Sequence, residues 1–268
     1  MAESQSWNAR EIDGCTFSGN FARERQDQKG VGNGGAVLVS APASQILLSI
    51  SDSVFKANEA TRGGAVAASS STPSTIQIRD QNNRFQSNWA VSGGAVHLSG
   101  DVVITSSGSL FRENRADHGG AISIVQRSIF RVIPGASRVT IANNTAVRGG
   151  GIMCRRCGKF CCLWLFIGNA FVGHMLFRAG VRFLANVARE YGGALFAFEF
   201  QGILTLPGPY FDGNVAAVGG AVALWDHGDA FIGPGDNQIL FTRNIALTGG
   251  ALFIKAENAV SVTTLVKS

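Results

Sequence analysis

One short phrase returns eight times along this chain, and it restricts the fold more than any other feature. It consists of a Phe, an Asn three residues later, a Gly-Gly pair and a small aliphatic residue, as in the copy FKANEATRGGAV from Phe55 to Val66. Successive Asn positions from Asn58 to Asn244 lie 30, 26, 30, 42, 28 and 30 residues apart. Self-similarity at such a period indicates a repeat architecture, in which each unit is stabilised by packing on its neighbours.

The motif is nearly constant, whereas the segments between its copies vary in length. From the second copy onward the Asn and the first Gly are five residues apart, except at Asn186 and Gly192, where they are six apart. A fixed corner with adjustable connections is typical of a scaffold that carries variable loops. The motif positions, which we predict to be structural, are Phe17, Asn20, Phe55, Asn58, Gly63, Gly64, Phe85, Asn88, Gly93, Gly94, Phe111, Asn114, Gly119, Gly120, Asn144, Gly149, Gly150, Phe183, Asn186, Gly192, Gly193, Phe211, Asn214, Gly219, Gly220, Phe241, Asn244, Gly249 and Gly250.

Each repeat has room for short strands and none for helices. An apolar run follows each Gly pair, as at 95–98, a second run follows in most repeats, as at 102–104, and the Phe-x-x-Asn segment makes a third. No stretch of about 12 residues has an apolar period of 3.6, and Gly-Gly would break a helix. We therefore predict an all-β fold, a single-stranded, right-handed parallel β-helix of about eight coils, like that of pectin lyases.

The repeats cover nearly the whole chain, so we expect one elongated domain. The β-helix is predicted over residues 15–268, after an N-terminal segment 1–14 with little order. In such a fold like residues stack about 4.8 Å apart, which predicts an internal Phe column with Ile141 as its one substitute, and a ladder of Asn side chains. The Gly pair would permit positive φ and close backbone approach at a corner. We expect Asn114→Ala to cost on the order of 1–3 kcal/mol.

Composition and charge exclude some classes of protein. A hydrophobic content of 46% excludes a disordered chain. The net charge is +5, but Lys and Arg are scattered, so we expect no nucleic-acid partner, whereas an anionic polysaccharide or cell surface is compatible with the charge. Residues 1–20 are polar and have no secretory signal, which leaves open a cytoplasmic chain or the loss of an export signal from a fragment or gene model. The stretched first repeat and a last repeat that stops after one strand both favour a fragment of a larger protein.

An irregular, Cys-rich insertion is predicted at about 153–180. A zinc or iron–sulfur site, a transmembrane helix over the apolar run 161–177, and disulfides of unknown pairing are all open interpretations. A second Cys-x-x-Cys is missing and the apolar run is interrupted, so we favour a plain loop insertion or non-native sequence from a wrong gene model. The cysteines of this segment are Cys154, Cys157, Cys161 and Cys162.

The residues that could perform catalysis are dispersed. Cleavage of a polysaccharide needs paired carboxylates, or acidic clusters that bind calcium beside a base. One local concentration, Asp226, His227 and Asp229, could bind calcium or act through the imidazole, but a polar loop is the favoured interpretation. We expect no catalytic residues, no metal and no cofactor, with a polysaccharide lyase or hydrolase acting near this loop as the alternative.

The repeated pair of phrases, Phe-x-x-Asn and Gly-Gly-Ala followed by Val, Ile or Leu, resembles the repeat signature of the polymorphic outer membrane proteins of chlamydiae. The resemblance covers roughly residues 15–255. In that family the repeats build a β-helical passenger that is exported through a β-barrel and acts as an adhesin. The resemblance therefore implies a surface or extracellular protein whose partner is a surface protein or a glycan. Uncapped coils at either end would also favour end-to-end self-association.

Overall fold

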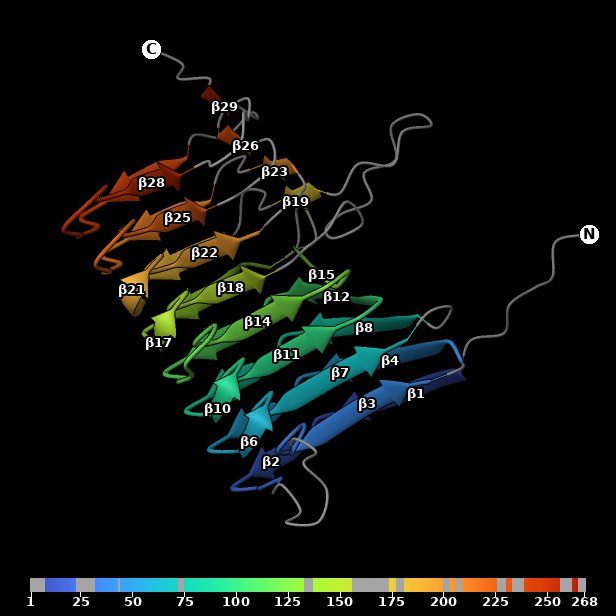
Figure 1. Cartoon of the computed structure of the whole chain (residues 1–268). Coiled ribbons are helices and arrows are strands. Elements are labelled where there is room, and N and C mark those ends of the chain that lie inside the picture. Colours follow the sequence, from blue (N-terminus) through green and yellow to red (C-terminus); the bar gives the residue numbers. More distant parts are fainter. Residues whose placement is uncertain are drawn as a thin grey trace, which may run out of the picture.

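The structure is a computed structural model, and every regular element in it is a strand. It describes residues 8–22, 32–42, 44–71, 75–132, 137–155, 174–176, 181–199, 203–205, 209–225, 230–232, 239–255 and 262–264. Neighbouring strands pair in parallel and stack as a solenoid, which Figure 1 shows rising in sequence order from blue to red. The predicted all-β parallel solenoid is confirmed.

Two eight-stranded sheets run the length of the solenoid, and each repeat contributes one strand to each sheet. The first sheet, here called the Gly-Gly sheet, follows the Gly pairs and comprises β3 (Val37–Ala41), β7 (Val66–Ser70), β11 (Val96–Ser99), β14 (Ile122–Val125), β18 (Ile152–Arg155), β22 (Leu195–Phe198), β25 (Val222–Trp225) and β28 (Leu252–Lys255). The second, the Phe sheet, comprises β2 (Thr16–Ser18), β5 (Val54–Lys56), β9 (Arg84–Gln86), β13 (Leu110–Arg112), β16 (Val139–Ala142), β20 (Val181–Leu184), β24 (Tyr210–Asp212) and β27 (Leu240–Thr242).

A third face of the solenoid is formed by two shorter sheets. The five-stranded sheet contains β1 (Asn8–Asp13), β4 (Ile46–Ser51), β8 (Ile76–Gln81), β12 (Val102–Ser107) and β15 (Ile129–Val132). The four-stranded sheet contains β19 (His174–Leu176), β23 (Ile203–Thr205), β26 (Ala230–Ile232) and β29 (Val262–Thr264). In Figure 1, β4, β8 and β12 lie behind the Gly-Gly sheet.

The core holds the predicted aromatic column. Phe55 pairs in register with Phe85, and Phe85 with Phe111, so equivalent rings lie directly over one another. The centroids of the Phe85 and Phe111 rings are 4.7 Å apart, and their planes differ by 3°. Phe55, Phe85, Phe111, Phe183 and Phe211 are among the largest fully buried side chains. Each recurrence of the motif is therefore one rung.

The two departures from the motif on the fifth rung lie against each other. Ile141 takes the Phe position, between Phe111 and Phe183 in register, and Gly151 stands where other rungs have Ala. A Cβ at Gly151 would lie 3.1 Å from Cγ2 of Ile141 and 2.7 Å from the carbonyl oxygen of Ala194. The glycine therefore provides the space that the β-branched side chain needs, and the two departures are coupled.

The structure differs from the sequence prediction at the N-terminus and after each Asn. Residues 8–13, expected to have little order, form β1, which pairs with β4 over six residues, because Ile12 packs against the core. From the second rung onward, the residues between each Asn and Gly pair form a fourth segment, which we call the arm. In some rungs the arm is a strand, as in β6 (Glu59–Arg62), β10 (Trp89–Ser92), β17 (Thr145–Arg148) and β21 (Val187–Tyr191), and in others it has only isolated bridges.

Candidate functional site

The predicted Asn positions form one unbroken ladder from Asn20 to Asn244. The backbone N–H and the side-chain Nδ2 of Asn88 both donate to Oδ1 of Asn114, at 3.0 and 2.9 Å. Nδ2 of Asn88 also donates to the carbonyl oxygen of Phe55, at 3.0 Å. The same bonds recur between the other neighbouring rungs. The ladder uses the donors and acceptor of each internal Asn to join rungs, so these side chains are structural.

The Gly pairs complete the same corner. Gly63 has a φ of +62°, a conformation that favours glycine, and Gly64 lies under the backbone of the next rung. A Cβ at Gly64 would collide with the carbonyl oxygen of Gly94 and approach the backbone of Trp89 within 3 Å. The Gly pairs of the motif therefore allow one rung to pack closely on the next.

The sequence-predicted candidates for catalysis and metal binding fall largely outside the described residues. Asp226, His227 and Asp229 lie there, as do Cys157, Cys161, Cys162 and most of the insertion expected at about 153–180. Cys154 is described: it is buried in β18 and takes part in a disulfide. Among the described residues no group of three or more His, Cys, Asp or Glu side chains could hold a metal ion. Within the same ranges, no helix has the length and apolar character needed to cross a bilayer.

Sequence reasoning missed a buried carboxyl group at another corner. Asp80 on β8 stacks in register between Ile50 and Ser106, inside the solenoid. Its Oδ1 accepts hydrogen bonds from Nδ2 of Asn83 (2.6 Å) and Oγ of Ser109 (2.9 Å), and its Oδ2 accepts one from Oγ of Ser106 (2.5 Å). Burial raises the pKa of Asp80 above its ordinary value of 3.8, and these hydrogen bonds offset the rise only in part.

We expect Asp80→Asn to stabilise the protein at pH 7. A carboxyl group whose pKa is raised by folding favours the unfolded state once the pH exceeds about 3.8, because the unfolded chain then releases the proton first. Asn has the same shape and no charge, and its amide can donate to Ser106. The expected gain in the free energy of unfolding is about 1 kcal/mol at pH 7 and vanishes near pH 3. Urea unfolding at both pH values measures it, and a loss at pH 7 would contradict the assignment.

A Ser–His–Ser contact lies on the outer side of the Gly-Gly sheet, beneath the arm. Nδ1 of His97 is 3.2 Å from Oγ of Ser92, which donates to Oγ of Ser123 at 2.9 Å. Burial, and to a smaller extent the positive charge of Arg62, lower the pKa of His97 to about 3. A general base works best with a pKa near the operating pH. A pKa this low does not favour a role for His97 as a general base near neutral pH.

His97 predicts a stability that falls in mild acid. Its pKa is about 3 in the folded protein and about 6.5 in the unfolded chain, so stability is fully present above pH 6.5 and is lost as the pH falls towards 3. Between pH 6.5 and 5 the expected loss is about 2 kcal/mol. His97→Ser, which copies Ser123 on the next rung, should lack this part of the loss. Equal losses in both proteins, measured by urea unfolding at pH 7 and 5, would refute the prediction.

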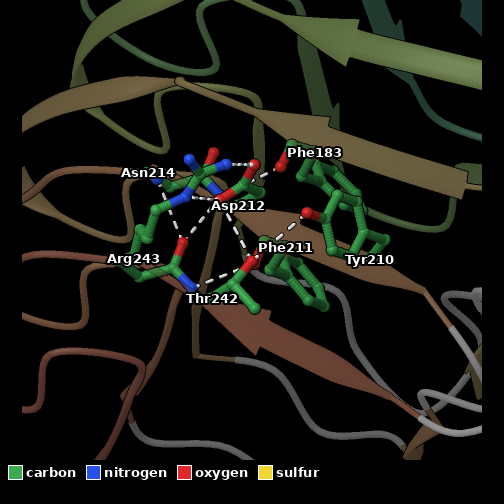
Figure 2. A network of polar contacts seen from close by, with 8 residues as sticks. Phe183, Tyr210, Phe211, Asp212, Asn214, Thr242 and Arg243 are labelled. Carbon is green, nitrogen blue, oxygen red and sulfur yellow. Dashed lines mark hydrogen bonds and ion pairs between the residues drawn. The ribbon is translucent and has the colours of Figure 1, made fainter.

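An exposed polar network joins the last two rungs of the Phe sheet. Figure 2 shows Arg243 reaching Asp212, with Thr242 and Tyr210 beside them. Nε of Arg243 donates to Oδ1 of Asp212 at 2.9 Å, and Oγ1 of Thr242 donates to the same oxygen at 3.0 Å. The Arg243 guanidinium lowers the pKa of Asp212 below its ordinary value. A single carboxylate paired with a cation is a poor proton acceptor, so this network ties rungs together.

The outer side of the Gly-Gly sheet carries an aromatic cluster in its C-terminal half. Phe196 is buried there, with Tyr191, Phe198 and Trp225 half-buried around it. The ring centroids of Tyr191 and Phe196 are 5.2 Å apart, and those of Tyr191 and Trp225 are 5.1 Å apart. Sequence reasoning missed this cluster because its members fall at outward positions, where the repeats share no residue type.

The comparisons with known proteins give one partial match. A 70-residue segment, 26% of this chain, is 37% identical to the "Probable outer membrane protein pmp13" of Chlamydia pneumoniae and covers 7% of its length. The chain thus matches a small part of that relative. No family model and no solved structure matches the chain. Over about a quarter of its length, the chain is therefore similar to a chlamydial outer membrane protein of the Pmp group.

Proposed function

We propose that this chain is a non-enzymatic, cell-surface or secreted repeat protein, acting as an adhesin-like passenger or a structural rod. The proposal rests on the observation that the repeated Asn and Phe residues of the motif are used in contacts between rungs. Each internal Asn binds its two neighbouring rungs, and the Phe rings are buried in the core. The outward positions differ from rung to rung, as expected of a scaffold that displays variable surfaces.

The similarity to an outer membrane protein supports the cell-surface location. That relative is named as a probable outer membrane protein. A rigid solenoid suits display at a surface, because its length grows by one rung per repeat while its cross-section stays constant. The partner in this proposal is a protein or glycan on another surface, bound through the outward side chains.

An adhesion assay with an activity control tests the proposal. Beads coated with the purified chain should bind cultured epithelial cells more than beads coated with an unrelated β-solenoid of similar charge. The same chain should release no reducing or unsaturated ends from polygalacturonate. Binding no better than the control beads would refute adhesion. Turnover that is lost in Asp226→Ala would instead establish the carbohydrate-active alternative.

Antibody labelling of the source cells tests the location. Labelling of intact cells at the level of permeabilised cells is the expected result, since a surface passenger is accessible without permeabilisation. Labelling that requires permeabilisation would place the protein inside the cell and would contradict the proposal.

A further inference from the structure

We propose that the last rung of one copy of this chain stacks on the first rung of a second copy, so that copies associate head to tail. The inference does not rest on the proposed surface function, because it concerns only the two ends of the solenoid. The N-terminal face is the side of the first rung, residues 8–22 and 32–41, that faces away from the second rung. The C-terminal face is the side of the last rung, residues 239–255, that faces away from the seventh. Figure 1 shows the two rungs at opposite ends of the stack, in blue and red.

Core positions that are fully buried in the inner rungs are only partly buried at both faces. Phe17 begins the aromatic column and Phe241 ends it, and both are partly buried, whereas the Phe rings between them are fully buried. Val37 and Leu252 hold the same place on the Gly-Gly sheet in the first and last rungs, and they too are partly buried. A second copy that stacks on either face would remove this apolar surface from water, which favours association.

The register of the two long sheets matches the apolar residues of one face to those of the other. Phe17 pairs with the Phe of the second rung, and Phe241 with that of the seventh, so stacking would place Phe17 of the second copy over Phe241. The centroids of the Phe211 and Phe241 rings are 4.9 Å apart with planes that differ by 6°, and the second copy would continue this column. By the same register, Val37 of the second copy would lie over Leu252.

The backbone groups of the Gly corner are also complementary between the two faces. The N–H of Gly220 donates to the carbonyl oxygen of Gly249 on the last rung, at 3.1 Å. The equivalent donor of the last rung is Gly250, and the described residues provide no acceptor for it. The equivalent acceptor of the first rung is Gly34, and no described residue donates to its carbonyl oxygen. At this corner head-to-tail stacking pairs a donor with an acceptor, whereas two like faces would place like groups together.

The Asn ladder has the same polarity. The N–H and Nδ2 of Asn214 donate to Oδ1 of Asn244, at 3.0 and 2.9 Å, but among the described residues the N–H of Asn244 has no acceptor. At the other end, Asn20 is exposed, and its Oδ1 accepts no hydrogen bond from a described residue. Stacking would therefore let Asn244 donate to Asn20 of the second copy and would extend the ladder across the junction.

The space at Gly250 distinguishes the C-terminal face from the inner rungs and supplies a test. A Cβ at Gly220 would lie 2.1 Å from the carbonyl oxygen of Gly250, so a side chain there would collide with the next rung. A Cβ at Gly250 would meet only the carbonyl oxygen of Asn244 among the described atoms, at 3.5 Å, and Gly250 does not have a positive φ. A side chain at Gly250 should therefore be compatible with folding, but it would occupy the space that a second copy needs.

Sedimentation velocity of the full chain over a range of concentrations tests the association. We expect a series of oligomers that lengthens with concentration, because a head-to-tail contact leaves a free face at each end. Gly250→Leu and, at the opposite face, Asn20→Ala should each weaken association at least tenfold while remaining folded, which a thermal melt checks. Trp89→Ser removes an exposed ring on the third rung and, as the matched control, should associate like the unchanged chain. A monomer throughout, a dimer that does not grow, unchanged association in the folded end variants or a loss in Trp89→Ser would overturn the proposal.

A crosslink between copies tests the register of the contact. Thr16 and Leu240 hold the same place on the first and last strands of the Phe sheet, so Thr16 of the second copy would lie beside Leu240. Within one chain the two positions are roughly 34 Å apart and cannot be joined by a disulfide. Oxidised Thr16→Cys/Leu240→Cys, in a Cys15→Ser background, should give a series of chains linked between positions 16 and 240, and adding Gly250→Leu should abolish it. No link between these positions, or links only between two copies of position 240, would contradict head-to-tail stacking.

Discussion

Replacing Asn114 with Ala is expected to lower the free energy of unfolding by at least about 3 kcal/mol. Asn114 accepts from the backbone N–H and Nδ2 of Asn88 and donates to the carbonyl oxygen of Phe85 and to Asn144. Its loss would remove an acceptor from the buried backbone N–H and Nδ2 of Asn88, and a donor from the carbonyl oxygen of Phe85, all in the preceding rung. This is at or above the upper end of the 1–3 kcal/mol expected from sequence, because each internal Asn serves two neighbouring rungs.

A matched variant at the first rung separates the loss of the ladder hydrogen bonds from the loss of an Asn side chain in general. Asn20 is exposed and its side chain donates to Asn58 without accepting from another rung in the described residues. Asn20→Ala should therefore cost about 1 kcal/mol or less. Urea unfolding followed by circular dichroism measures both proteins. Similar losses in the free energy of unfolding at the two positions would show that the internal Asn side chains do not stabilise the solenoid as predicted.

Gly120→Ala is expected to lower the free energy of unfolding by more than about 4 kcal/mol or to prevent folding. Losses of this size are exceptional for single substitutions. A Cβ at this position would collide with the carbonyl oxygen of Gly150 and come within 2.8 Å of that of Thr145. Both obstacles are backbone atoms of the next rung, so no side-chain rotation relieves them. The rungs would have to separate locally, and this would break ladder bonds on both sides.

Gly213→Ala is the control, because it replaces a glycine of positive φ without introducing a steric clash. Gly213 has a φ of +63° but open space around its Cβ position, so only the left-handed conformation is penalised, by about 1–2 kcal/mol. Soluble yield and the midpoint of thermal unfolding compare the two variants. A Gly120→Ala protein that melts no lower than Gly213→Ala would show that the rungs are not stacked as closely as described.

The parts of the fold that could be predicted from sequence are those that every rung repeats. Phe55 and Asn58 recur with the same spacing because stacking places equivalent residues in one environment, and that environment selects one residue type. The strands after the Gly pairs were predictable for the same reason. The arm was missed because its outer positions differ between rungs, and β1 because only Ile12 among its residues packs on the core.

Features that the repeats do not share depend on where a residue lies in the folded chain, and a single sequence does not show this. Asp80 looks like an ordinary polar residue, and its burial follows only from the register that places it between Ile50 and Ser106. His97 meets Ser92 because the arm folds over the sheet. Phe198 and Trp225 come from neighbouring repeats, and their contact follows from the register of β22 and β25.

The most direct test of the central claim, that each repeat is one rung stacked in register, is crosslinking between neighbouring rungs. Ser69 and Ser99 pair in register on the outer side of β7 and β11, whereas Val125 lies two rungs from Ser69. Cα atoms about 4.8 Å apart can be joined by a disulfide, and those two rungs apart cannot. Peptide mapping by mass spectrometry should find a crosslink between positions 69 and 99 in Ser69→Cys/Ser99→Cys. It should find none between positions 69 and 125 in Ser69→Cys/Val125→Cys, and the opposite pattern would contradict the stacked solenoid.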